Sequence, residues 1–190
     1  MSVQRPDTSR IAPLAQPFSQ ELQAIFDRIM PSGVPPLVLF TTLARDPRLF
    51  EKFRNGSLLD KGHLTLRQRE IVIHRVAARC GSEYEWGVHA SFFAAHAELD
   101  PTQLAATIHG AADTSCWSAD EQHLLEVCDQ LHAGADISDA LWTKLRGAFD
   151  EMAIVEVILL AGFYRTVAYL TNALRLPLEP FGQRFPAKTA

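Results

Sequence analysis

The sequence has few cysteines, and none of them stands in the spacing used by redox or zinc sites. Its three cysteines, Cys80, Cys116 and Cys128, form no CxxC pair. An odd number of thiols without such a pair argues against a disulfide framework and against a zinc site. We therefore expect free thiols in a reducing compartment.

Basic runs and long uninterrupted apolar runs are lacking as well. The formal net charge is −4, from 18 Lys and Arg against 22 Asp and Glu, and no basic cluster suited to phosphates is present, so we expect no nucleic-acid partner. The N-terminal segment MSVQRPDTSRIAPLAQPF lacks the apolar core of a signal peptide. The longest apolar stretch, MAIVEVILLAGFY, is interrupted by Glu156 and is too short for a bilayer span. These absences predict a cytoplasmic protein without a membrane partner.

No stretch alternates apolar and polar residues over the length of a strand, and no internal repeat is evident. A chain of 190 residues that is 47% hydrophobic and 21% charged is long enough for one folded domain with a real core. Helical patterns separated by proline and glycine predict helices at about 18–30, 35–45, 47–58, 65–80, 83–97, 101–110, 118–133, 138–148 and 150–173. One of them opens with a Ser118–Glu121 capping box.

The sequence therefore predicts an all-α protein, a helical bundle in one domain. Residues 1–17 contain prolines and show no periodicity, which is typical of an arm laid on the surface or on a partner subunit. The helical domain is expected at 18–178, followed by a C-terminal tail at 179–190.

The predicted helix at 65–80 carries a carboxylate on its apolar side. At about 100° per residue, Glu70 falls between Leu66 and Ala77, while Arg75 and Arg79 lie opposite. A buried carboxylate must find a partner, or its pKa rises because burial disfavours the charged form. Two interpretations of Glu70 remain open: a structural ion pair with an arginine of another helix, or a functional carboxylate.

The segment GSEYEWGVHA begins the next predicted helix and gathers groups suited to proton transfer. Glu85, His89, Phe92 and His96 share one stripe, with Phe93 beside it. Glu85 and His89 are four residues apart, so the carboxylate can bind the imidazole and raise its basicity. Such a pair suits a general base or a proton relay.

Structural explanations exist for the same residues. Ser82 and Glu85 have the spacing of a capping box, so Glu85 could simply cap its own helix, and His89 and His96 could be satisfied core histidines. A zinc or iron site from Glu85, His89 and His96 is disfavoured because the two histidines are two turns apart. We predict neither a metal nor a cofactor.

The stretch LTLRQREIVIHRVAARCGSEYEWGVHASFFAAHAELD resembles the core motif of the carboxymuconolactone decarboxylase family, which includes the alkylhydroperoxidase-D-like proteins. The later stretches CWSADEQHLLEVCDQL and FDEMAIVEVILLAGFYRTVAYLTNALRLPLE resemble the C-terminal half of longer members. The likeness covers most of residues 35–178. It implies the all-α, alkylhydroperoxidase-D-like type of helical bundle.

The peroxidase branch of that family uses a glutamate, a CxxC pair, and a histidine four residues after the second cysteine. In this sequence the glutamate corresponds to Glu70 and the histidine to His89, whereas the cysteine positions hold Ser82 and Glu85. Cys80 lies two residues before the first cysteine position and has no second thiol at CxxC spacing. The resemblance therefore implies the decarboxylase-like branch, and peroxidase activity is not expected.

For this branch the resemblance implies acid-base chemistry on a small carboxylated or lactone-type substrate. Its implied catalytic residues are His89, Glu85 and Glu70; the substrate-binding residues proposed beside them are Tyr84, Trp86 and Ser82. Arg67 or Arg69 is the nearest cation in sequence for a substrate carboxylate.

Family members are oligomeric, with pockets near subunit contacts. The resemblance thus implies a homo-oligomer, a trimer or hexamer before a dimer, whose interface helps to close the site. Two other functions stay open: an alkylhydroperoxidase-like redox protein with an unusual thiol arrangement, and a non-catalytic oligomeric binding protein.

Overall fold

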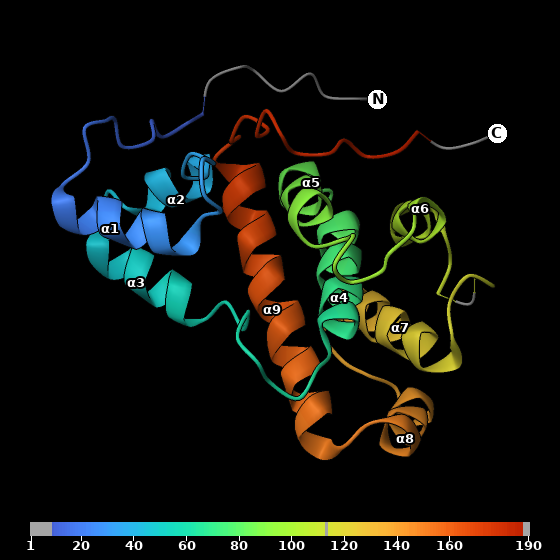
Figure 1. Cartoon of the computed structure of the whole chain (residues 1–190). Helices are drawn as coiled ribbons and strands as arrows, with labels where there is room; N and C mark the ends of the chain where they lie inside the picture. The colour runs from blue at the N-terminus through green and yellow to red at the C-terminus, as the bar shows by residue number, and fades with distance from the viewer. Residues whose placement is uncertain (1–8, 113, 188–190) are drawn as a thin grey trace.

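The computed structural model describes residues 9–112 and 114–187, and within these residues all regular structure is helical. The predicted all-α helical bundle is confirmed (Figure 1). In chain order the helices are α1 (Gln20–Ile29), α2 (Val38–Leu43), α3 (Pro47–Asn55), α4 (Leu66–Arg79), α5 (Glu83–Phe92), α6 (Pro101–His109), α7 (Ala119–Gly134), α8 (Asp139–Ala148) and α9 (Glu151–Ala173).

Local signals explain most helix starts. The predicted Ser118–Glu121 capping box forms at the start of α7, and Asp100 caps α6 in the same way, with a proline in its first turn. Three predicted helices are too long by three or more residues at one end, and of these the one at 47–58 ends at Asn55. The one at 35–45 begins only at Val38, after two prolines, and the one at 83–97 ends at Phe92.

Helix α4 lies at the centre of the bundle and packs against α5, α6, α7 and α9. Helix α9 runs through the middle of the molecule, with α1–α3 on one side and α4–α8 on the other (Figure 1). The α1–α3 group has a small core of its own around Phe26, Ala44 and Phe50. The larger core lies between α4, α5, α7 and α9.

The central position of α4 corrects one sequence-based interpretation. Arg75 was expected on the polar side of this helix, yet its side chain is fully buried and paired with Asp129 of α7. Every residue from Glu70 to Ala77 is buried, because helices surround α4 on several sides. An amphipathic pattern read from one helix therefore located the apolar stripe but misplaced this arginine.

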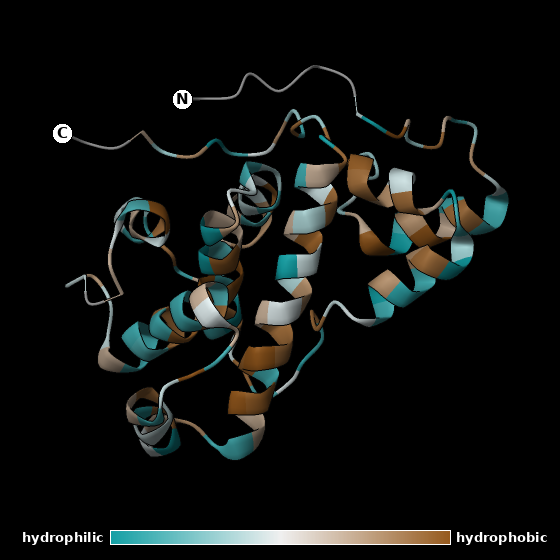
Figure 2. Ribbon diagram, turned by 180° about the vertical axis from the view of Figure 1, so that it is seen from behind, coloured by the Kyte–Doolittle hydropathy of each residue, from teal (hydrophilic) through white to brown (hydrophobic). Residues whose placement is uncertain are grey.

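Helix α9 is longer than its apolar run suggested. Its 23 residues have the length and composition of a membrane span, which corrects the expectation that this segment is too short. Helices α4, α5 and α7 cover part of it, and its N-terminal half is mainly hydrophobic (Figure 2). Its exposed face carries Met152, Val155, Leu159 and Tyr169.

The described parts of the N-terminal arm and the C-terminal tail are hydrogen-bonded to the rest of the protein. In the predicted arm, the backbone N–H groups of Arg10 and Leu14 donate to the carbonyls of Leu174 and Thr41. In the predicted tail, Gln183 N–H donates to the Gly87 carbonyl of α5 at 3.1 Å, and a Cβ on Gly87 would lie 2.2 Å from the Gln183 oxygen. The tail therefore lies directly on α5. Residues 1–8 of the arm and 188–190 of the tail are outside the described residues.

Candidate functional site

A tight turn between α4 and α5 brings the candidate residues together. Gly81 has a φ of +63°, a conformation that glycine adopts without a Cβ penalty. The N–H groups of Gly81 and Ser82 donate to the carbonyls of Ala78 and Ala77 at 3.0 and 2.8 Å, the pattern of a Schellman motif. Helix α5 therefore returns along α4, and Glu70 on α4 meets His89 on α5.

The start of α5 distinguishes the two interpretations of Glu85. Ser82 Oγ accepts a hydrogen bond from Glu85 N–H and lies 2.8 Å from Thr171 Oγ1 of α9. The reciprocal half of a capping box is not made, because Ser82 N–H donates to Ala77. Instead, Glu85 Oε1 lies 3.3 Å from His89 Nε2. Ser82 caps the helix, and the Glu85 side chain contacts the histidine.

His89 lies between two carboxylates. Its Nδ1 is 2.8 Å from Glu70 Oε2, and its Nε2 faces Glu85. The exposed fractions are 0% for Glu70, 3% for His89 and 6% for Glu85. Each ring nitrogen faces a carboxylate, and an ionised carboxylate can only accept a hydrogen bond. Both nitrogens can therefore donate only if both carry a proton, which favours the doubly protonated ring.

The charges of the cluster follow from this geometry. Burial alone would lower the pKa of His89, but the Glu70 carboxylate and the hydrogen bonds to Glu70 and Glu85 outweigh it and raise the pKa to about 10. Burial would raise the pKa of Glu70, but His89 opposes it and the pKa falls below its ordinary value. At neutral pH the cluster therefore holds an imidazolium beside a carboxylate.

A second histidine, missed in the sequence, shares the same carboxylate. His74 Nδ1 lies 2.7 Å from the Glu70 carbonyl oxygen, which can only accept, so Nδ1 carries the proton. Burial lowers the pKa of His74 to about 4, although Glu70 opposes the shift. Because a charged His89 already occupies Glu70, His74 stays neutral. Its position four residues after Glu70 was the available signal.

The arginines expected to bind a substrate carboxylate are engaged elsewhere. Arg67 pairs with Glu121 at 2.6 Å and donates to the carbonyl of Ala97. The Nε of Arg69 lies 3.6 Å from Glu70 Oε1, and its Nη1 donates to the carbonyl of Leu59. Arg67 thus contacts the segment after α5, and Arg69 contacts the segment before α4. Neither is among the residues that line the cavity beside His89.

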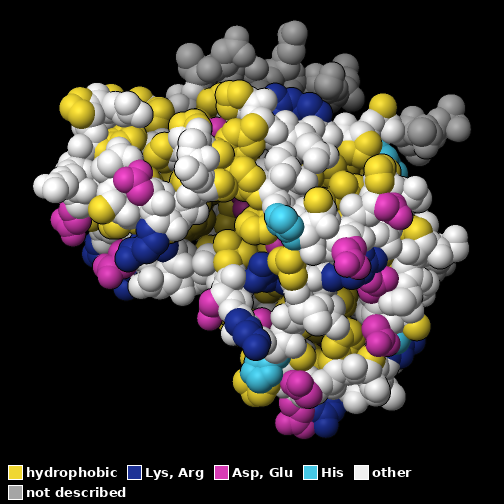
Figure 3. Space-filling model, in the orientation of Figure 1, with side chains coloured by type: hydrophobic (Ala, Val, Ile, Leu, Met, Phe, Trp, Pro, Cys, Tyr) yellow, Lys and Arg dark blue, Asp and Glu magenta, His cyan; other side chains and the backbone are white. Residues whose placement is uncertain are grey.

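The cavity beside His89 has a volume of about 670 Å³ and lies between the α1–α3 group and helices α5 and α9. Figure 3 shows hydrophobic side chains gathered around a hollow between these parts. The predicted stripe, which runs along α5 and into the turns after it, forms one wall with Glu85, His89, Phe92, Phe93 and His96. The rest of the lining comes from other elements and includes Leu37, Leu39, Phe40, Phe53, Arg54, Asn55, Ser57, Phe163, Tyr164 and Val167.

Two aromatic rings hold the imidazole in place. The rings of Phe93 and Tyr164 are both centred 5.1 Å from the ring of His89, and Tyr164 stands nearly perpendicular to it. Tyr164, on α9, also lines the cavity. Burial and the nearby Glu85 and Glu70 raise the pKa of Tyr164 well above its ordinary value.

The flanking aromatics expected to form the pocket wall point elsewhere. Tyr84 Oη hydrogen-bonds to Glu179 and accepts from Leu39 N–H, while Trp86 Nε1 donates to Thr107 Oγ1 at 3.0 Å. Neither they nor Ser82 belong to the cavity lining. Residues adjacent to Glu85 in a helix point about 100° away from it, so they face the core and the C-terminal segment.

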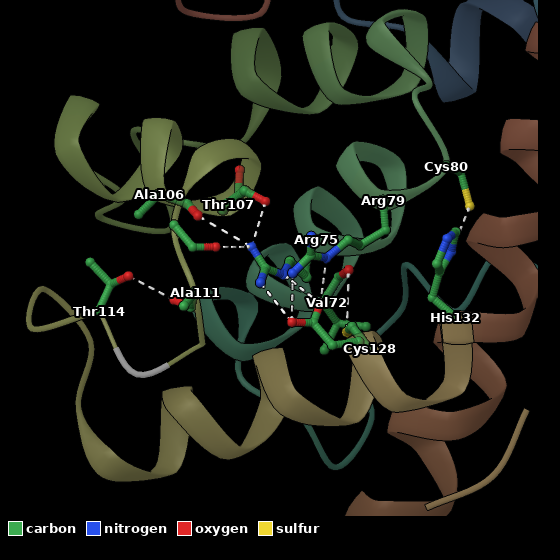
Figure 4. A network of polar contacts seen from close by, with 12 residues as sticks. Val72, Arg75, Arg79, Cys80, Ala106, Thr107, Ala111, Thr114, Cys128 and His132 are labelled. Carbon is green, nitrogen blue, oxygen red and sulfur yellow. Dashed lines mark hydrogen bonds and ion pairs between the residues drawn. The ribbon is translucent and has the colours of Figure 1, made fainter. Parts of the chain in front are cut away.

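The cavity contains no cysteine, and the described residues offer no metal cluster. All three cysteines are described, and none lines the cavity. Cys80 Sγ lies 3.8 Å from His132 Nδ1 beside a different hollow (Figure 4), and burial raises the pKa of its thiol even though Arg165 opposes this. Within the described ranges, no group of three or more His, Cys, Asp or Glu side chains is arranged to hold a metal ion.

Comparison with protein families gives a match that includes helices α4 and α5. Residues 47–130, from α3 into α7, match the model of the carboxymuconolactone decarboxylase family. This matched segment includes Glu70, Glu85 and His89. A comparison with curated proteins gives no match.

Solved structures of other proteins share the fold of this chain. An uncharacterized peroxidase-related protein from Silicibacter sp. TM1040 is 16% identical with a TM-score of 0.82, covering 98% of this chain and 100% of the other. The debrominase Bmp8 in complex with 2,3,4-tribromopyrrole is 14% identical with a TM-score of 0.73, covering 92% and 94%. A putative antioxidant defence protein AhpD from Agrobacterium tumefaciens is 18% identical with a TM-score of 0.61, covering 72% and 95%.

The protonation states of His89 and His74 can be measured directly. We expect nitrogen NMR shifts to show His89 as an imidazolium from pH 6 until the pH nears about 10, and His74 as neutral until it falls to about 4. Since the folded pKa of His89 exceeds its ordinary 6.5, its stabilising contribution is complete below about pH 6.5 and is lost as the pH rises through about 10. A His89 ring that titrates near 6.5 would contradict the buried ion pair.

Proposed function

We propose that the chain is a cytoplasmic enzyme of the decarboxylase-like branch of the family, with His89 as the proton donor to a small carboxylated or lactone-type substrate. The observation that carries the proposal is a charged histidine, held between Glu70 and Glu85, on the wall of an apolar cavity that no cysteine lines. An acid with a raised pKa is in its protonated form at neutral pH, which a proton donor requires.

The proposed reaction begins with loss of carbon dioxide from the substrate. The bond between the carboxylate carbon and its neighbour breaks, and its electron pair passes into an enolate. The enolate carbon then takes a proton from His89, and solvent later restores this proton. Glu70 binds Nδ1 of His89 and stabilises the positive ring before proton transfer. Glu85 faces Nε2, and Glu85 and His89 both line the cavity.

The apolar cavity supports this chemistry on physical grounds. Around His89 the lining is mainly aromatic and aliphatic, which weakens solvation of the departing carboxylate and strengthens the interaction between the enolate and the imidazolium. Loss of carbon dioxide followed by protonation is redox-neutral, so the reaction needs no electron donor and is compatible with a cavity that no thiol lines.

The proposal is tested by incubating the purified protein with a panel of carboxylated lactones in D2O. The measurements are carbon dioxide release and deuterium at the carbon that loses it. Cys80→Ser serves as the control for thiol chemistry and should keep full activity, since Cys80 lies outside the cavity. Reduction of peroxides that requires a dithiol and disappears in Cys80→Ser would instead support the redox alternative.

We also propose a homo-oligomer, a trimer or hexamer before a dimer. The exposed face of α9 presents Met152, Val155, Leu159 and Tyr169, with exposed fractions of 43–58%, and an apolar stripe of this kind favours burial against another chain. Light scattering should give a multiple of 21.1 kDa, and Leu159→Lys should shift the mass downward. A wild-type mass of one chain at all micromolar concentrations would contradict the assembly.

A further inference from the structure

One arginine lines the same cavity as His89 but comes from a different helix. Arg54 lies near the end of α3 and belongs to the cavity lining. Its guanidinium carbon is 5.4 Å from the centre of the Phe50 ring, and its Nε is buried without a hydrogen-bond partner. Among residues 9–112 and 114–187, no carboxylate lies within ion-pair distance of it.

Other arginines close to the site differ from Arg54 in this respect. Arg67, Arg69 and Arg75 each face a carboxylate, at 2.6, 3.6 and 2.7 Å. The buried Nε of Arg54 has lost hydration without a replacement hydrogen bond, which costs free energy. A ligand carboxylate in the cavity would supply that bond, and the planar guanidinium matches a carboxylate with two parallel hydrogen bonds.

The other residues that line the cavity favour an apolar ligand. Its walls supply aromatic and aliphatic side chains, namely Leu37, Leu39, Phe40, Phe53, Phe92, Phe93, Phe163, Tyr164 and Val167. A cavity of about 670 Å³ is within the range that binds small organic molecules. Flat aromatic bodies are favoured because ring contacts add to the burial of apolar area.

The distribution of charge also orients such a ligand. At the α5 wall, the imidazolium of His89 is already flanked by the carboxylates of Glu70 and Glu85, so an additional anion gains little there and meets repulsion. At the α3 wall, Arg54 has no such partner among the described residues. A carboxylate that the ligand keeps is therefore favoured at Arg54, whereas the carboxylate that leaves lies toward His89, where its repulsion by Glu70 and Glu85 ends when carbon dioxide is lost.

We propose that Arg54 binds a carboxylate that the substrate retains, and that this enzyme selects an aromatic or similarly apolar carboxylic acid. Arg54 is thus a specificity-determining residue on α3. The role assigned to the ligand end near His89 rests on the proposed function. The preference for a carboxylate at Arg54 is a property of binding alone and can be measured without turnover.

Calorimetric titration with 2-naphthoate and its uncharged analogue 2-naphthamide tests the assignment at physiological salt. The wild type should bind the naphthoate about tenfold or more tightly than the amide, because hydrogen bonds between charged groups are the stronger ones. Arg54→Gln should bind both ligands with similar affinity. Unchanged affinity of this variant for the amide would show that its cavity is intact.

Arg48→Gln is the matched control, since Arg48 lies on the same helix with a side chain that is 66% exposed and outside the cavity lining. It should retain the wild-type preference. The proposal is overturned if wild type does not bind naphthoate at millimolar concentration, if wild type shows no preference, if Arg54→Gln keeps it, or if Arg48→Gln loses it equally. An Arg54-dependent preference without any turnover would overturn the proposed reaction and leave this assignment standing.

Discussion

Replacing His89 by Gln is expected to reduce turnover by about 10²- to 10⁴-fold, the usual contribution of a positioned acid or base. The amide can still donate a hydrogen bond to Glu70 or Glu85, but it has no proton to transfer to a carbanion. The measurement is kcat and kcat/KM for the substrate found by the carbon dioxide assay. His109→Gln, at the exposed end of α6, should behave like the wild type.

A loss of activity by unfolding must be separated from a loss of chemistry. His89→Gln removes the cation beside the fully buried Glu70, and an unpaired buried charge destabilises a protein by about 3–5 kcal/mol. The double variant Glu70→Gln with His89→Gln replaces the ion pair by two neutral amides and should recover much of that stability. It should remain inactive. Normal activity in either variant would favour a purely structural histidine.

Replacing Arg75 by Met is expected to lower the free energy of unfolding by about 3–5 kcal/mol. The fully buried guanidinium makes two hydrogen bonds to Asp129, at 2.8 and 2.7 Å. It also donates to the carbonyls of Thr107 and Gly110 at the end of α6, each at 2.9 Å (Figure 4). Methionine fills similar space but leaves the carboxylate and both carbonyls without this donor. Urea unfolding monitored by circular dichroism measures the change.

Arg79 provides the matched control for Arg75. It also binds Asp129, at 2.6 and 2.7 Å, but its side chain is 36% exposed, so water replaces its bonds when it is removed. Arg79→Met should cost at most about 1 kcal/mol. Equal losses for the two variants would mean that the buried network does not hold α4, α6 and α7 together.

The helices were predictable because their signals are local. A cap such as Ser118, a proline in a first turn, or a glycine after a last turn acts on its own few residues. Their ends were predicted less well where tertiary contacts compete. The helical pattern continued to residue 97, but α5 ends at Phe92 and the following turns reach Glu98, with a positive φ of 55°. Hydrophobic periodicity does not report such a change.

The candidate site was predictable in part. The resemblance identified Glu70, Glu85 and His89, and the structure brings them together because Gly81 turns α5 back along α4. The predicted binding role of Tyr84 and Trp86 relied on adjacency in sequence. In a helix, adjacent side chains point in different directions, and these two face the core.

By itself, the sequence determined the all-α architecture, the absence of a CxxC pair, and the spacing that allows Glu85 to contact His89, since all three depend on residues a few positions apart. Only the tertiary structure decided the rest. Arg54 and His89 line the same cavity because α3 and α5 pack around it, and Arg75 is buried because α6 and α7 cover that side of α4. Burial and charge partners depend on the packing of distant segments, and no short window of sequence contains that information.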